Sequence, residues 1–109
     1  MSYKVLVTST FQKDTKRLFK KYPSIKSDLQ HLIETLETNP TQGTALGNDL
    51  YKIRLAIGST GKGKSGGARV ISLVKVICEE VFLLSLYSKT EKSTISKEEL
   101  SELISKLNR

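Results

Sequence analysis

Residues 50–75, LYKIRLAIGSTGKGKSGGARVISLVK, decide how the rest of the chain has to be arranged. Two runs with the alternation typical of β-strands flank a loop rich in glycine, so the stretch predicts a β-hairpin. The stretch carries six lysine and arginine residues and no aspartate or glutamate, and four of the chain's seven glycines lie between Gly61 and Gly67. A hairpin with this charge predicts a polyanionic partner, of which RNA and DNA are the common examples.

The alternation within the hairpin assigns its cations to one face. In the first run, apolar side chains alternate with Lys52 and Arg54, so both cations lie on the face opposite the core. The second run, predicted as a strand over residues 68–78, places Arg69 and Lys75 on one face in the same way. We therefore expect a sheet with one apolar face and one cationic face.

A third strand is predicted over residues 81–89, after a short turn at Glu79 and Glu80. Period two puts Phe82, Leu84 and Leu86 on one face of this strand. The opposite face then adds a tyrosine and a lysine to the exposed, cationic side of the sheet. The residues expected on that side are Lys52, Arg54, Arg69, Tyr87 and Lys89.

Outside these strands the chain predicts one further strand and three helices. Residues 3–8 alternate as a strand, and Ser9 with Gln12 has the form of a capping box that starts a helix. Pro23 separates this helix from a second one, which ends before Asn39-Pro40. Residues 41–49 read as a polar loop, and a capping box of Ser96 and Glu99, with Ile95 and Leu100 as its hydrophobic staple, starts a C-terminal helix.

The order β-α-α-β-β-β-α predicts an α+β fold with a mainly antiparallel, twisted sheet. Two helices are expected to pack together on one face, because each has a single apolar stripe and is unstable alone. The C-terminal helix also has an apolar stripe, and we expect it to cover the sheet rather than to bind a partner helix. A length of 109 residues predicts one domain, residues 1–109.

Composition limits the chemistry and the compartment. The net charge of +7 indicates an acidic partner. Cys78 is the only cysteine and is expected to be a small buried apolar residue, and His31, the only histidine, is expected to face solvent. No carboxylate cluster, signal peptide or membrane span is predicted, so we expect no metal, no cofactor, no membrane and a cytoplasmic location.

These limits restrict how the chain would cleave RNA, if that is its activity. Without a metal site or a histidine pair, the ribose 2′-OH has to attack the adjacent phosphate. Lysines crowded by other cations have lowered pKa values and exchange protons near neutral pH, whereas arginine stays charged and binds phosphate oxygens. A basic surface with no specific ligand, and a glycine-rich turn with no role beyond flexibility, are the alternative interpretations.

Three segments resemble the RelE/HigB superfamily of bacterial type II toxins, and most closely a HigB-like branch: K-I-R-L-A, G-K-G-K-S-G-G-A-R-V-I and L-L-S-L-Y-S-K-T-E-K. The resemblance implies a RelE-like fold and a ribosome-dependent mRNA endoribonuclease that inhibits translation without a metal ion. It implies three partners: a cognate antitoxin, the ribosomal A site with its 16S rRNA, and mRNA. A ParE-like toxin that poisons DNA gyrase, and a degenerate member that binds without cleaving, are the alternatives.

Carried onto this sequence, the resemblance assigns roles to the cations of the hairpin and the third strand. The catalytic residues it implies are Lys52, Arg54, Lys64, Arg69 and Tyr87. The RNA-binding residues it implies are Lys62, Lys64, Lys75, Lys89 and Lys92. Because Arg69 is expected to face solvent, its replacement by alanine is predicted to relieve growth arrest without disturbing folding.

Overall fold

A computed structural model describes residues 2–61, 63 and 66–107. Its elements, in chain order, are β1 (Lys4–Val7), α1 (Ser9–Lys21), α2 (Ile25–Thr38), β2 (Thr44–Gly47), β3 (Leu50–Leu55), the 3-10 helix η1 (Gly58–Thr60), β4 (Ala68–Lys75), β5 (Glu80–Ser88) and α3 (Lys97–Leu107). The predicted α+β class is confirmed. None of the helices in the described part of the chain is both long enough and apolar enough to cross a bilayer.

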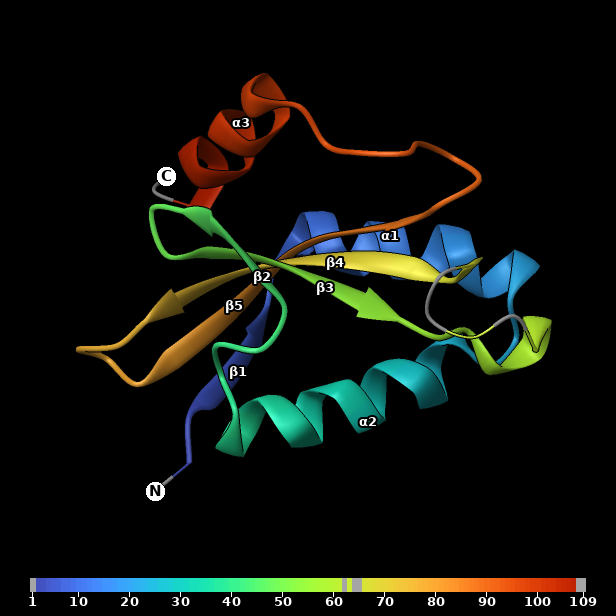
Figure 1. The fold of residues 1–109 in the computed structure, drawn as a ribbon, viewed down its shortest axis with the longest axis horizontal. Helices are drawn as coiled ribbons and strands as arrows, with labels where there is room; N and C mark the ends of the chain where they lie inside the picture. The colour runs from blue at the N-terminus through green and yellow to red at the C-terminus, as the bar shows by residue number, and fades with distance from the viewer. Residues whose placement is uncertain (1, 62, 64–65, 108–109) are drawn as a thin grey trace.

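The five strands form one sheet in the order β1-β5-β4-β3-β2 (Figure 1). β1 is parallel to β5, and every other neighbouring pair is antiparallel, as predicted for most of the sheet. The prediction of a polar loop over residues 41–49 is wrong in part, because this segment contains the edge strand β2. All four residues of β2 are exposed, so the segment lacks the apolar alternation that reveals a half-buried strand.

The helices lie on both faces of the sheet. α1 and α2 pack together against one face, where the main core is built around Phe11, Leu36 and Val70. α3 lies on the opposite face, where its apolar stripe contacts a smaller cluster that includes Ile71 and Tyr87. The expectation that α3 covers the sheet is confirmed, and the face it covers is the one that carries the cations.

A β-bulge changes the faces of β5. The register shifts between Ile71 and Ser72 of β4, and this shift leaves Leu84 as an extra residue on β5. Leu84 packs under α3, whereas Leu86 packs in the core beneath α1 and α2. The prediction that Phe82, Leu84 and Leu86 share a face is therefore wrong for Leu86, because a bulge interrupts the period of two.

β4 ends at Lys75, three residues earlier than predicted, and a turn follows. Glu79 has a φ of 54°, in the left-handed region. Ile77 is 99% exposed, and Cys78 is exposed as well. The prediction that Cys78 is buried is wrong, because it belongs to this turn and not to a strand.

The caps of α1 and α3 differ in how well the sequence predicts them. The hydroxyl of Thr8, one residue before the predicted cap at Ser9, accepts a hydrogen bond of 3.3 Å from the Phe11 N–H. At α3 the predicted capping box is confirmed. The Ser96 N–H donates to Glu99 Oε1, the Glu99 N–H donates to Ser96 Oγ, and both distances are 3.1 Å.

Candidate functional site

Three of the predicted site residues lie side by side across the sheet. Arg54 of β3 is paired in register with Arg69 of β4, and Arg69 is paired with Tyr87 of β5. Residues paired in this way point to the same face, with Cβ atoms about 4.5–5.5 Å apart. We call Arg54, Arg69 and Tyr87 the cationic row. The sheet thus brings together residues that are 33 positions apart in the sequence.

The three side chains of the cationic row differ in how far they are exposed to solvent. Arg54 is exposed, as predicted. Arg69 is only 6% exposed and Tyr87 only 1%, so the prediction that these two side chains face solvent is wrong. For Tyr87 the physical reason is α3, which packs on this face and covers that end of the row. The Arg69 guanidinium donates from Nη1 to the Ala68 carbonyl at 3.0 Å.

The Tyr87 hydroxyl is buried, and within the described residues it has no hydrogen-bond partner. Burial raises the pKa of Tyr87; Arg69 opposes this shift, and Glu99 adds to it. The phenol therefore stays protonated at neutral pH. Lys92 lies over the ring, with Nζ 5.2 Å from its centroid, and is ion-paired with Glu99 at the start of α3.

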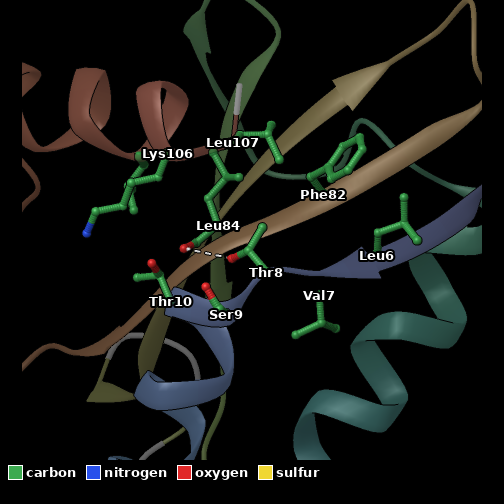
Figure 2. Close-up of a pocket in the computed structure, with 10 residues that line it drawn as sticks. Leu6, Val7, Thr8, Ser9, Thr10, Phe82, Leu84, Lys106 and Leu107 are labelled. Carbon is green, nitrogen blue, oxygen red and sulfur yellow. Dashed lines mark hydrogen bonds between the residues drawn. The ribbon is translucent and has the colours of Figure 1, made fainter. Parts of the chain in front are cut away.

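The cover that α3 provides is loose. None of its described residues is buried, in contrast to α1 and α2. A cavity of about 300 Å³ separates its C-terminal end, at Lys106 and Leu107, from β1 and β5 (Figure 2). Thr8 and Phe82 are among the residues on its other side. Packing with voids gains less dispersion energy, so α3 is held on the sheet less firmly than α1 and α2.

Two more predicted residues lie close to the row. Lys52 is half-buried on the same face, two residues from Arg54 and opposite Ile71. Lys89 is exposed just after β5, where its backbone N–H donates to the Gly67 carbonyl at 3.1 Å. Lys92 lies over the Tyr87 ring, so lysines flank the row at both of its ends.

The remaining predicted lysines do not flank the row in the described structure. Lys75 lies at the opposite end of β4, six residues from Arg69 and therefore about 20 Å away. Its Nζ lies 5.3 Å from the centroid of the Phe82 ring. Lys62 and Lys64 lie outside the described residues, and their roles stay predictions.

The loop that carries those two lysines is anchored at its base to the start of α2. The Ser24 and Ser59 side chains each accept a hydrogen bond of 2.8 Å from the other residue's backbone N–H. The Gly58 N–H donates to Asp28 Oδ2 at 3.0 Å. The base of the loop is therefore held in a defined position beside the sheet.

Gly67, at the other end of the loop, has a packing role. A Cβ atom at this position would lie 2.0 Å from the Leu55 carbonyl oxygen, which is a backbone atom that cannot move aside. Glycine is thus required where β3 and β4 approach each other, whether or not the loop binds phosphate.

A network that the sequence did not predict fixes the end of β5. Arg17 of α1 contacts Glu91 through Nε and Asp14 through Nη1, both at 2.8 Å. The second Asp14 oxygen accepts the Leu86 N–H at 3.0 Å, and Glu91 accepts the Ser88 N–H at 3.0 Å. We call Asp14, Arg17 and Glu91 the α1–β5 clamp.

Electrostatics strengthen this clamp. The hydrogen bond from Arg17 lowers the pKa of Glu91, and the same bond raises the pKa of Arg17. The clamp holds Leu86 and Ser88, the residues on either side of Tyr87. Its partners are more than 70 positions apart, so a single sequence carries no local signal for it.

Replacing Asp14 by alanine should lower the free energy of unfolding by about 1–3 kcal/mol, because the Leu86 N–H loses its acceptor in a partly buried position. Urea denaturation followed by circular dichroism measures the change. Lys13→Ala, an exposed neighbour on α1, is the matched control and should stay within about 0.5 kcal/mol of the wild type. Equal stabilities of the two variants would show that the clamp contributes nothing.

Metal-ligating and histidine chemistry have little support at this face. Within residues 2–61, 63 and 66–107, no group of three or more His, Cys, Asp or Glu side chains could hold a metal ion. The His31 side chain is 82% exposed on α2, as predicted, with Nδ1 3.9 Å from Glu34 Oε1. The described candidates for chemistry are therefore the cationic row and its neighbouring lysines.

Comparison with known proteins adds a family and several structures. The model of the family described as the RelE toxin of the RelE/RelB toxin–antitoxin system matches residues 3–107. No curated protein sequence matches the chain. The fold is similar to that of a mutant of E. coli toxin RelE in the free state, with a TM-score of 0.66 and 20% identity over 97% of this chain and 98% of that one.

Two toxin–antitoxin complexes are also similar in fold. One is the intact E. coli RelBE complex, with a TM-score of 0.62 and 20% identity over 80% of this chain and 96% of the other. The second is RelBE2 from Mycobacterium tuberculosis, with a TM-score of 0.58 and 15% identity over 81% and 99% of the two chains. At these identities the structures show a common fold.

Proposed function

Because the chain belongs to the RelE family of toxins from toxin–antitoxin systems, we propose that it inhibits translation in the cytoplasm by cutting mRNA on the ribosome, and that a cognate antitoxin restrains it. The observation that carries this proposal is the cationic row. Two arginines and a protonated tyrosine lie side by side on three neighbouring strands, beside further lysines.

The pairing of Arg54 with Arg69 favours a phosphate ligand. Like charges directly opposite each other on neighbouring strands destabilise a sheet. A phosphate bound between them removes this repulsion, and the planar guanidinium groups match its oxygens. Arg54 is exposed and meets the phosphate first, and Arg69 then binds it from the adjacent strand.

The row supplies the groups that cleavage by the 2′-OH needs. The 2′-oxygen attacks phosphorus while the bond to the 5′-oxygen breaks, which gives a 2′,3′-cyclic phosphate and a free 5′-hydroxyl. Arg54 and Arg69 neutralise the charge on the phosphorane. The sequence leaves the base to Lys52, Lys62 or Lys64; of these, Lys52 lies in the described structure, on the same face as the row.

Tyr87 suits the role of the acid that protonates the leaving 5′-oxygen. Its raised pKa keeps the hydroxyl protonated at neutral pH, so a proton is available to donate. The hydroxyl forms no hydrogen bond to described residues that would have to break first. The ring, at 1% exposure, has no open face on which a nucleobase could stack while α3 is in place.

RNA reaches Tyr87 only when α3 moves. α3 is held by half-buried apolar side chains and by the pair between Lys92 and Glu99, next to a cavity. RNA phosphate competes with Glu99 for Lys92, which weakens the pair as the substrate binds. We therefore place the movement of α3 before the chemical step.

Mapping of RNA ends tests the proposed function. Purified toxin and a defined mRNA should give new 5′ ends only when ribosomes are present. These ends should carry a 5′-hydroxyl, which polynucleotide kinase labels without prior phosphatase treatment. Cleavage of free mRNA at the same rate would contradict ribosome dependence, and 5′-phosphate ends would contradict attack by the 2′-OH.

A parallel assay separates the proposal from the gyrase-poisoning alternative. After induction, plasmid supercoiling should be unchanged while mRNA is cut. Altered supercoiling with intact mRNA would instead assign the chain to the ParE-like class.

A further inference from the structure

A second basic surface lies on the opposite side of the sheet from the cationic row. It consists of Lys13, Lys16 and Lys20 of α1 and Lys26 of α2, which we call the basic helix face. Lys16, Lys20 and Lys26 border one surface hollow, beside Phe19. We propose that the basic helix face binds the phosphate backbone of double-helical RNA, and so holds the toxin on ribosomal RNA while the row acts on mRNA; this identification of the RNA rests on the proposed function.

The charge of this face is not balanced by the protein itself. Lys13, Lys16 and Lys20 follow each other at helical spacings of three and four, and like charges at these spacings destabilise a helix by about 0.2–0.5 kcal/mol per pair. Asp14 is the only acidic residue of α1, and it is engaged in the clamp with Arg17. Within the described residues, none of the four lysines takes part in an ion pair.

The aromatic residue on this face indicates a duplex rather than a single strand. Proteins that bind single strands stack the bases on open aromatic rings. Phe19 is 40% exposed, but Lys26 lies over its ring with Nζ 4.2 Å from the centroid. That ring face is therefore covered by a cation. Duplex RNA is recognised through its shape and its phosphates, which require cations on a rigid support such as α1.

The alternative ligand is an acidic segment of a protein, which would use the groove between α1 and α2. The groove does have apolar walls: Val7 is 40% exposed and Ile33 is half-buried, although Phe11 and Leu29 are buried. A protein helix needs apolar contacts to bind stably, whereas RNA phosphates need only the lysines. Lys13 and Lys20 do not line this groove, whereas a phosphate backbone that runs along α1 reaches them, so the spread of the charge favours RNA.

Salt-dependent binding tests this inference. The probe is a fluorescently labelled, blunt RNA duplex of about 16 base pairs, a length that duplex-binding domains span. The variant Lys13→Gln/Lys16→Gln/Lys20→Gln should bind it at least tenfold more weakly, and the slope of log affinity against log salt should fall by about 3. Fluorescence anisotropy at several salt concentrations measures both quantities.

A control matched in charge locates the effect. Lys4→Gln/Lys97→Gln/Lys106→Gln removes three exposed lysines from other surfaces and should keep the wild-type slope. Equal losses for the two triple variants would overturn the proposal, because binding would then depend on net charge alone. A poly-glutamate peptide that binds as tightly as the duplex, with the same loss in the first variant, would overturn it as well.

One further variant separates this inference from the proposed function. Arg54→Ala should lower the salt slope by no more than about 1, against about 3 for the first triple variant, because it removes a single cation on the other side of the sheet. If no form of the protein cleaves mRNA but the basic helix face still determines duplex binding, the proposed activity fails and the second surface stands. If cleavage occurs and both triple variants bind the duplex equally, the second surface fails alone.

Discussion

Phenylalanine in place of Tyr87 should slow RNA cleavage on ribosomes by about 10²–10⁴-fold, the range expected for loss of a general acid. The same change should raise the free energy of unfolding by about 1 kcal/mol, because a buried hydroxyl without a described partner is removed. Time courses of end mapping and urea denaturation measure the two effects. Loss of activity together with a gain in stability is a combination that an unfolding artefact cannot produce.

The phenylalanine variant also decides between two roles of the ring. If Tyr87 acts only by stacking, the phenyl ring replaces it and cleavage stays near the wild-type rate. That result would remove Tyr87 from proton transfer and leave its hydroxyl without a role.

Alanine in place of Arg54 should lower the cleavage rate by about 10²–10³-fold, which is typical of losing one group that stabilises transition-state charge. Because the side chain is exposed, its removal should change the free energy of unfolding by no more than about 0.5 kcal/mol. Growth arrest after induction should be relieved in parallel. Lys4→Ala, an exposed lysine on the edge strand β1, is the control and should arrest growth normally.

Arg69 is the less suitable position for this test. Its side chain is 6% exposed, so Arg69→Ala should lower stability as well as activity, and relief of growth arrest would then have two causes. The expectation that folding stays intact depended on a solvent-facing charge and does not hold. If the Arg54→Ala variant is as stable as the wild type and cleaves mRNA at the wild-type rate, the cationic row does not take part in the proposed chemistry.

The sequence was sufficient where a pattern is local. Period two placed Lys52 and Arg54 on the face opposite the core, and the structure confirms this assignment. The Ser96–Glu99 capping box was also predicted correctly, because its hydrogen bonds depend only on four consecutive residues. The segments in and after the hairpin that resemble the RelE/HigB superfamily predicted the family, and the family comparison confirms it. The HigB-like branch stays a prediction.

The sequence was insufficient where several elements meet. The burial of Tyr87 depends on which face of the sheet α3 packs against, and an amphipathic stripe does not specify that face. The bulge at Leu84 places Leu86 on the opposite face from the one predicted, and no glycine at this position indicates a bulge in the sequence. The α1–β5 clamp joins residues far apart in the chain, and its charges look like ordinary helix-surface charges until the fold brings them together.

The parallel pairing of β1 with β5 determines when the first strand can join the sheet during synthesis of the chain. Lys4 of β1 pairs in register with Glu80 of β5. β1 can therefore join the sheet only after more than 70 further residues have been synthesised. Closing a loop of this length slows folding, and contacts this distant form late. Under the proposed function, a nascent chain should therefore stay inactive until β5 has been synthesised.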